Sequence, residues 1–94
     1  MQQEKVIRIP PTFSIEEASL FRESMRGYVS SGTTHFLLDF SDCRFIDSTG
    51  LGVIVSAYKK CVEAGGKIRL QALAPNVLKV FQLTRLNNVF EILP

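Results

Sequence analysis

The chain has 94 residues, of which 46% are hydrophobic and 21% are charged. This length and composition indicate one globular domain with a single modest core. The formal net charge is only +2, and the basic residues are scattered and not interleaved with aromatic side chains, so we expect no nucleic-acid binding.

The sequence carries no sign of export, membrane insertion or metal binding. The first ten residues, MQQEKVIRIP, lack the apolar stretch of a signal peptide, and no apolar run approaches the roughly 20 residues of a membrane span. Cys43 and Cys61 lie far apart, with no histidine near either one. We therefore expect a cytoplasmic protein without a metal ion or other cofactor.

The first third of the chain predicts a strand followed by a helix. The strand covers residues 5–9 and ends at two prolines, which remove donors from a strand ladder. Ser14 is placed to cap a helix over residues 14–32, and Glu17 completes a capping box. The apolar stripe of this helix comprises Ile15, Ala18, Leu20, Phe21, Met25, Tyr28 and Val29.

Strands and helices alternate through the rest of the chain. The expected elements are a buried strand at 35–40, a helix at 48–64, a strand at 67–73, a helix at 75–86 and a strand at 89–93. Gly65 and Gly66 end the central helix. The order β-α-β-α-β-α-β is typical of an α/β fold with parallel neighbouring strands and right-handed crossovers.

The segment FIDSTGLG, residues 45–52, places a carboxylate and two hydroxyls where a strand passes into a helix. A nucleophile elbow would need glycine at Ile46 and a histidine base, yet the only histidine, His35, is expected at the far end of its strand. A dinucleotide fingerprint would need its third glycine at Val55, and a phosphate-binding loop would need a lysine. We therefore expect a protein without catalytic residues that is not an enzyme.

Two interpretations of this segment remain. In the first, Asp47 or Ser48 is a helix cap that accepts hydrogen bonds from free backbone N–H groups. In the second, the serine is itself a substrate. A phosphate there would meet the positive end of the helix dipole, worth about 0.3–1 kcal/mol, and would add about −1.5 to −2 charges to the surface. The local sequence by itself favours the cap and leaves the switch open.

Residues 35–70, HFLLDFSDCRFIDSTGLGVIVSAYKKCVEAGGKIRL, resemble the STAS domains of bacterial anti-sigma-factor antagonists. The shared features are an apolar strand, a D-S-[S/T]-G-L-G turn, an amphipathic helix, a Gly-Gly stop and another strand. Residues 74–92 are similar to the family's third helix and final strand. The resemblance implies one STAS domain over residues 1–94, with helices packed on a mixed, mostly parallel sheet of four or five strands.

The resemblance also implies a function as a phospho-switched binding module. An unphosphorylated antagonist of this family binds an anti-sigma factor that is also a serine kinase, phosphorylation releases it, and a metal-dependent serine phosphatase resets it. Carried onto this chain, the phosphate acceptor is Ser48, with Thr49 as the alternative. The implied partner-binding surface comprises Ser14, Asp47, Ser48, Thr49, Gly50, Leu51, Gly52 and Val55.

Three features leave alternatives open. Leu51 and Val55 either widen the core stripe of the central helix or form a partner patch. Ser14 stands where the family has an aspartate beside the phosphorylation site, and one strand precedes the first helix where the family has two.

The competing functions are a non-switching structural STAS subunit of a signalling or lipid-transport assembly and a small-ligand binder. We expect a monomer, or a weak homodimer formed through the strand edge at residues 5–9.

Overall fold

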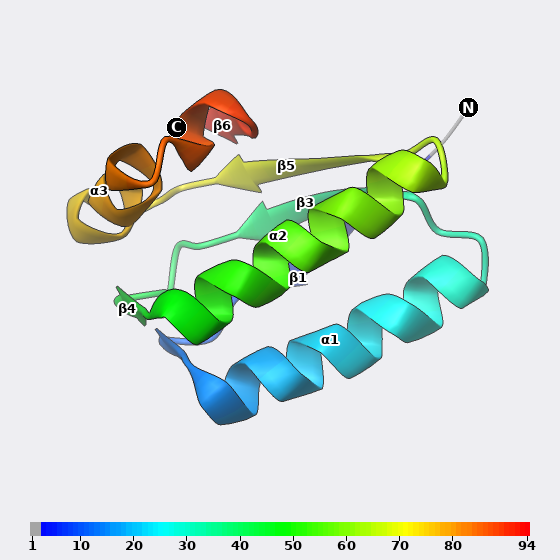
Figure 1. Ribbon diagram of the computed structural model, residues 1–94, viewed down its shortest axis with the longest axis horizontal. Helices are drawn as coiled ribbons and strands as arrows, with labels where there is room; N and C mark the ends of the chain where they lie inside the picture. Colours follow the sequence, from blue (N-terminus) through cyan, green and yellow to red (C-terminus); the bar gives the residue numbers. More distant parts are fainter. Residues whose placement is uncertain (1–2) are drawn as a thin grey trace.

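The strands of the main sheet all run parallel. The computed structural model describes residues 3–94, and its elements alternate along the chain in the expected order (Figure 1). In spatial order, the main sheet consists of β1 (Lys5–Arg8), β3 (His35–Asp39), β5 (Lys67–Gln71) and β6 (Glu91–Leu93). Each neighbouring pair is parallel, as expected for strands joined by crossovers. The predicted α/β fold is confirmed, with four strands in this sheet.

Two very short strands form a second, separate sheet. β2 (Thr12–Phe13) pairs in parallel with β4 (Phe45–Ile46). The prediction that a single strand precedes the first helix is wrong, because β2 lies between β1 and that helix. Strands of two residues are too short for an alternating pattern to show in the sequence.

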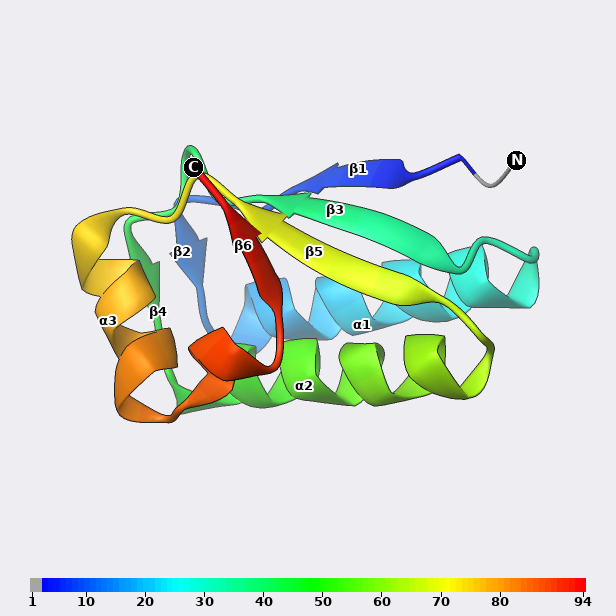
Figure 2. The same cartoon turned by 90° about the horizontal axis from the view of Figure 1, so that it is seen from above.

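The two long helices cover the same face of the main sheet. α1 (Ile15–Ser30) and α2 (Ser48–Glu63) run side by side beneath β1, β3 and β5 (Figure 2). The third helix, α3 (Pro75–Leu83), lies at one end of the domain and contacts β4. None of the helices in the described part of the chain is long and apolar enough to cross a membrane.

The third helix is shorter than the sequence predicted. It ends at Leu83 instead of residue 86, and a 3-10 turn, η1 (Leu86–Asn88), leads into β6. Arg85 separates the two, with a left-handed φ of 62°. A right-handed helix cannot include this backbone conformation, so the chain turns there.

The core lies between the sheet and the long helices. Phe36 and Leu38 of β3 and Ile68 and Leu70 of β5 are all buried. On α1 the buried residues are Ala18, Phe21 and Met25. Two members of the predicted stripe do not join them, because Ile15 and Leu20 are each 69% exposed. Leu20 lies two residues after Ala18, about 200° around the helix, on the solvent side.

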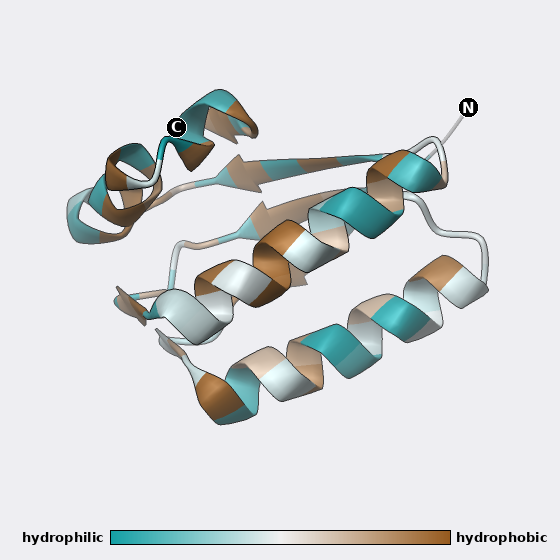
Figure 3. Ribbon diagram, viewed as in Figure 1, coloured by the Kyte–Doolittle hydropathy of each residue, from teal (hydrophilic) through white to brown (hydrophobic). Residues whose placement is uncertain are grey.

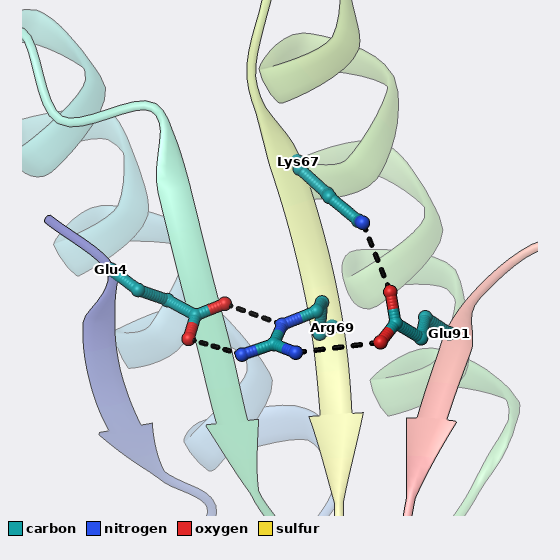
Figure 4. A network of polar contacts seen from close by, with 4 residues as sticks. All are labelled: Glu4, Lys67, Arg69 and Glu91. Atoms are coloured by element: carbon teal, nitrogen blue, oxygen red, sulfur yellow. Dashed lines mark hydrogen bonds and ion pairs between the residues drawn. The ribbon is translucent and has the colours of Figure 1, made fainter. Parts of the chain in front are cut away.

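The other face of the sheet carries ion pairs instead of apolar cover. Arg69 donates two hydrogen bonds of 2.7 Å to Glu4 and lies 3.4 Å from Glu91, which also pairs with Lys67 at 2.9 Å (Figure 4). The predicted strand at 35–40 is therefore buried on one side only. Parallel sheets are usually covered on both faces, and this charged network leaves the open face able to meet water.

Candidate functional site

The starts of α1 and α2 are brought together by the small sheet. The parallel register sets Phe13 beside Ile46, and the next residue of each chain segment is the N-cap of a helix, Ser14 for α1 and Asp47 for α2. The Ser14 hydroxyl donates a hydrogen bond to Asp47 Oδ2. Residues that are 33 positions apart in the sequence thus form the centre of the site.

Asp47 is held by both of its carboxylate oxygens. Oδ1 accepts a hydrogen bond from the Gly50 backbone N–H at 3.0 Å, which caps α2. The Ser14 hydroxyl, and next the Gly50 N–H, lower the pKa of Asp47 below its usual value. The carboxylate is therefore ionised at neutral pH and points in a set direction. Of the two predicted caps, Asp47 performs the capping, and Ser48 is the first residue of the helix.

Ser48 is exposed at the N-terminus of α2. Within residues 3–94, no hydrogen bond occupies its hydroxyl, and the same is true of the exposed Thr49 hydroxyl beside it. Because Asp47 already caps the helix, the structure does not need the Ser48 hydroxyl for that purpose. An enzyme could reach this hydroxyl without unfolding the domain.

The two glycines of the motif differ sharply. A Cβ at Gly50 would lie 2.3 Å from the Phe13 carbonyl oxygen and 2.7 Å from its ring, so no larger residue fits between α2 and β2. A Cβ at Gly52 would meet no heavy atom within 4 Å, and Gly52 is exposed. Gly50 therefore serves the fold, whereas nothing within the described chain requires a glycine at position 52.

The two apolar residues of the predicted surface, Leu51 and Val55, differ in how deeply they are buried. Leu51 is 9% exposed and belongs to the hydrophobic core, so the core interpretation holds for it. Val55 is half-buried. The predicted surface that remains accessible consists of Ser48, Thr49 and Gly52, with partial exposure of Ser14, Asp47 and Val55.

Two exposed apolar residues beside the motif were not predicted as part of the site. Phe45, the first residue of β4, is 51% exposed, and Ile15, the first residue of α1, is 69% exposed. Figure 3 shows hydrophobic ribbon at the start of α1 and along β4, at the same end of the domain as the start of α2. Ile15 directly follows Ser14 and Phe45 lies two residues before Asp47. This proximity in the sequence was the available signal, but both residue types normally indicate core.

His35 lies away from this site. It begins β3, at the end of the sheet opposite β4, and contacts the Thr34 hydroxyl at 3.0 Å (Figure 1). The prediction that it occupies the N-terminal end of its strand is confirmed. A serine at the start of α2 therefore has no histidine base in the described chain.

A hollow of about 300 Å³ lies between α1 and α2, farther along the helices from the motif. Its lining includes Arg22, Met25, Arg26, Val53, Ser56 and Lys60. None of residues 47–52 lines this hollow. The cations that could attract a small anion are therefore not at the motif.

Comparison with known proteins matches residues 2–94 to the STAS domain. The anti-sigma-B factor antagonist of Bacillus subtilis is 27% identical over 86 residues, which cover 92% of this chain and 78% of that protein. The crystal structure of tm1081 from Thermotoga maritima is 30% identical, with a TM-score of 0.87 over all of this chain and 83% of that one.

The anti-sigma factor antagonist SpoIIAA, in its unphosphorylated form, shares the fold with a TM-score of 0.77, over all of this chain and 83% of that one. It is 21% identical to this chain. The match to the domain family covers the whole described chain. The chain belongs to the STAS-domain family of anti-sigma factor antagonists.

Proposed function

We propose that this protein is an anti-sigma-factor antagonist that is switched by phosphorylation of Ser48. In its unphosphorylated form it binds an anti-sigma factor through the surface at the start of α2. Phosphorylation by that anti-sigma factor, acting as a serine kinase, releases it, and a metal-dependent serine phosphatase restores it. The observation that carries the proposal is the exposed, unbonded Ser48 hydroxyl next to an Asp47 that already caps the helix.

The shape of the surface supports protein binding. Ser48 and Gly52 are one helical turn apart and both are exposed, so another backbone can approach closely there. Phe45 and Ile15 add exposed apolar area near these small residues. Apolar contacts near small residues are typical of docking surfaces, whereas a catalytic site would need convergent reactive groups. We infer a binding regulator without enzymatic activity of its own.

The effect of a phosphate follows from its charge. A phosphoserine at residue 48 would carry about −1.5 to −2 charges, next to the ionised Asp47. The helix N-terminus stabilises part of that charge, so the domain keeps its fold. A partner that packs on the surface would have to desolvate it, and about 3 kcal/mol of unfavourable coupling weakens binding roughly a hundredfold.

A fold that accommodates phosphate is consistent with this mechanism. SpoIIAA has been solved in unphosphorylated and phosphorylated forms, with TM-scores of 0.77 and 0.75 against this chain. The same overall architecture thus exists in both chemical states of that protein. For this chain, a cytoplasmic location is part of the proposal, because the kinase and phosphatase would have to reach Ser48.

Phosphosite mapping by mass spectrometry on protein purified from its native host is the decisive experiment. We expect phosphate on Ser48, its loss in Ser48→Ala and its retention in Thr49→Ala. Ser48→Ala should hold the partner constitutively, and Ser48→Asp should bind it weakly. Absence of phosphate under all growth conditions, together with the same bound proteins for Ser48→Ala and wild type, would favour the non-switching structural subunit.

A further inference from the structure

β1 forms one edge of the main sheet. It pairs with β3 on one side, and no strand in residues 3–94 pairs with its other side (Figure 2). The Ile9 N–H donates to the Asp39 carbonyl, 2.8 Å away, and so points toward β3. Because backbone groups alternate in direction along a strand, the N–H and C=O groups of Val6 and Arg8 point outward. An edge of this kind is a template for another strand.

The side chains of β1, and of Glu4 directly before it, alternate between the two faces of the sheet. Lys5 points toward the helices, with its ammonium 4.9 Å from the centre of the Tyr28 ring of α1. Glu4 and Arg8 lie on the open face, where Glu4 binds Arg69 and Arg8 lies 3.9 Å from Asp39. Val6, between them, is 57% exposed. On the open face, the side chains along this edge are therefore acidic at Glu4, apolar at Val6 and basic at Arg8.

This row of three side chains is complementary to the same row of a second copy that runs in the opposite direction. In an antiparallel pair, directly opposed residues must lie on the same face of the sheet. With Val6 opposite Val6 of a second copy, Glu4 lies opposite Arg8 at both ends of the pair. The outward N–H and C=O groups of Val6 then bond across the two-fold axis, as in a hydrogen-bonded antiparallel pair. The alternative register centred on Ile7 would set Val6 against a charge and Glu4 against Pro10, which has no N–H to donate.

A groove beside the edge offers apolar surface to the inner side of an added strand. It has a volume of about 260 Å³ and lies between β1 and α1. Its lining includes Ile7, Pro10, Phe13, Leu20 and Phe21. Leu20, one of the two residues of the predicted core stripe that are exposed, is 69% accessible at this groove.

We propose that β1 is a homodimerisation edge, on which a second copy of this chain adds its own β1 antiparallel about a two-fold axis at Val6. The two main sheets become one continuous sheet with all four long helices on the same side. Two-fold pairing through one self-complementary patch is the commonest form of homo-oligomer. The paired strands have only four residues each, so the dimer is weak and depends on concentration. The edge contains none of residues 47–52, and the proposal is independent of the switch.

Cysteine cross-linking tests the register directly. Opposed residues in a hydrogen-bonded antiparallel pair have Cα atoms about 5.5 Å apart, within disulfide range. Val6→Cys should form a covalent dimer when a mild thiol oxidant is added. Val62→Cys is the matched control, since Val62 is 49% exposed on α2, and it should remain monomeric. The native Cys43 and Cys61 are buried, and burial raises the pKa of both thiols, so they should react slowly.

Sedimentation equilibrium provides the second, independent readout. The apparent mass of the wild type should rise with concentration from 10.5 kDa toward twice that value. Leu20→Asp should weaken the dimer about tenfold, while Leu83→Asp, at a site 75% exposed on α3, should leave it unchanged. Val6→Pro removes only an outward N–H and should abolish the dimer with the thermal midpoint preserved.

Two results would overturn the proposal. One is a monomeric mass for the wild type up to millimolar concentration. The other is an equal yield of covalent dimer from Val6→Cys and Val62→Cys, since random collision would then explain both. If an extended peptide were the natural occupant of the edge, the chain would likewise stay monomeric at every concentration.

Discussion

The Ser14 hydroxyl donates a hydrogen bond to the Asp47 carboxylate, and this bond ties the start of α1 to the start of α2. Ser14 also receives support from Glu17, whose carboxylate accepts from the Ser14 backbone N–H at 3.2 Å. The Ser14 hydroxyl fixes the direction of the Asp47 carboxylate without adding a charge of its own. A charge added at Ser48 would therefore stand next to the fixed, ionised Asp47.

Substitutions at Ser14 should change the pKa of Asp47. In Ser14→Ala the strongest cause of the lowered pKa is lost, so that pKa should rise toward its usual value, as measured by NMR titration. Ser14→Thr keeps a hydroxyl and should preserve most of the shift. Ser14→Asp sets two carboxylates together and should lower the thermal midpoint more at pH 7 than at pH 4. An Asp47 titration unchanged in Ser14→Ala would contradict the bond.

Alanine substitutions at the two motif glycines should change the free energy of unfolding in opposite directions. Gly50→Ala forces a methyl group into the Phe13 backbone and should lower the free energy of unfolding by about 1–3 kcal/mol. Gly52→Ala meets open space and should raise it by about 0.5–1 kcal/mol, because alanine is the better helix former. Urea denaturation of both variants decides the matter. Weaker partner binding by the more stable Gly52→Ala would place Gly52 in the interface.

Alanine substitutions at Leu51 and Phe45 should distinguish an effect on stability from an effect on partner binding. Leu51→Ala removes a buried side chain and should cost about 2–5 kcal/mol of unfolding free energy. Phe45→Ala changes a residue that is 51% exposed and should leave the thermal midpoint nearly unchanged while weakening partner binding. Calorimetry and a pull-down of the partner measure the two effects. A Phe45→Ala protein that binds like wild type would remove this residue from the surface.

Stability should fall on acidification. Hydrogen bonds and ion pairs lower the pKa values of Glu4, Asp39, Asp47 and Glu91 below their usual values, 4.5 for Glu and 3.8 for Asp. The unfolded chain therefore binds protons more readily than the native protein as the pH approaches these values. The stabilisation is present above about pH 5 and is lost as the pH falls through the lower, native pKa values.

Thermal melts between pH 7 and pH 3 measure this dependence. Arg69→Met removes the partner that lowers the pKa of Glu4 most and should make the acid dependence shallower. Lys60→Met is a control, because Lys60 takes part in no ion pair within the described residues. Identical pH profiles for wild type and Arg69→Met would show that the network seen in Figure 4 adds little in solution.

Much of the fold was visible in the sequence. The alternation of strands and helices, the ends of α2 and the cap at Ser14 follow from local patterns: apolar periodicity, paired glycines and hydroxyl residues before helices. The left-handed turn at Arg85 was not visible, because arginine has no special preference for that conformation. Nor was the exposure of Leu20, since an apolar residue reads the same on either side of a helix.

Local sequence patterns are enough to place a carboxylate and two hydroxyls at the start of a helix and to show the resemblance to STAS domains. The role of each of these groups depends on contacts that form only when the chain folds. The pairing of β2 with β4 brings Ser14 to Asp47, packs Phe13 on Gly50 and leaves Ser48 free. These contacts join residues more than 30 positions apart, and a local pattern cannot specify them. They depend on how separate segments pack, which is a property of the whole folded chain.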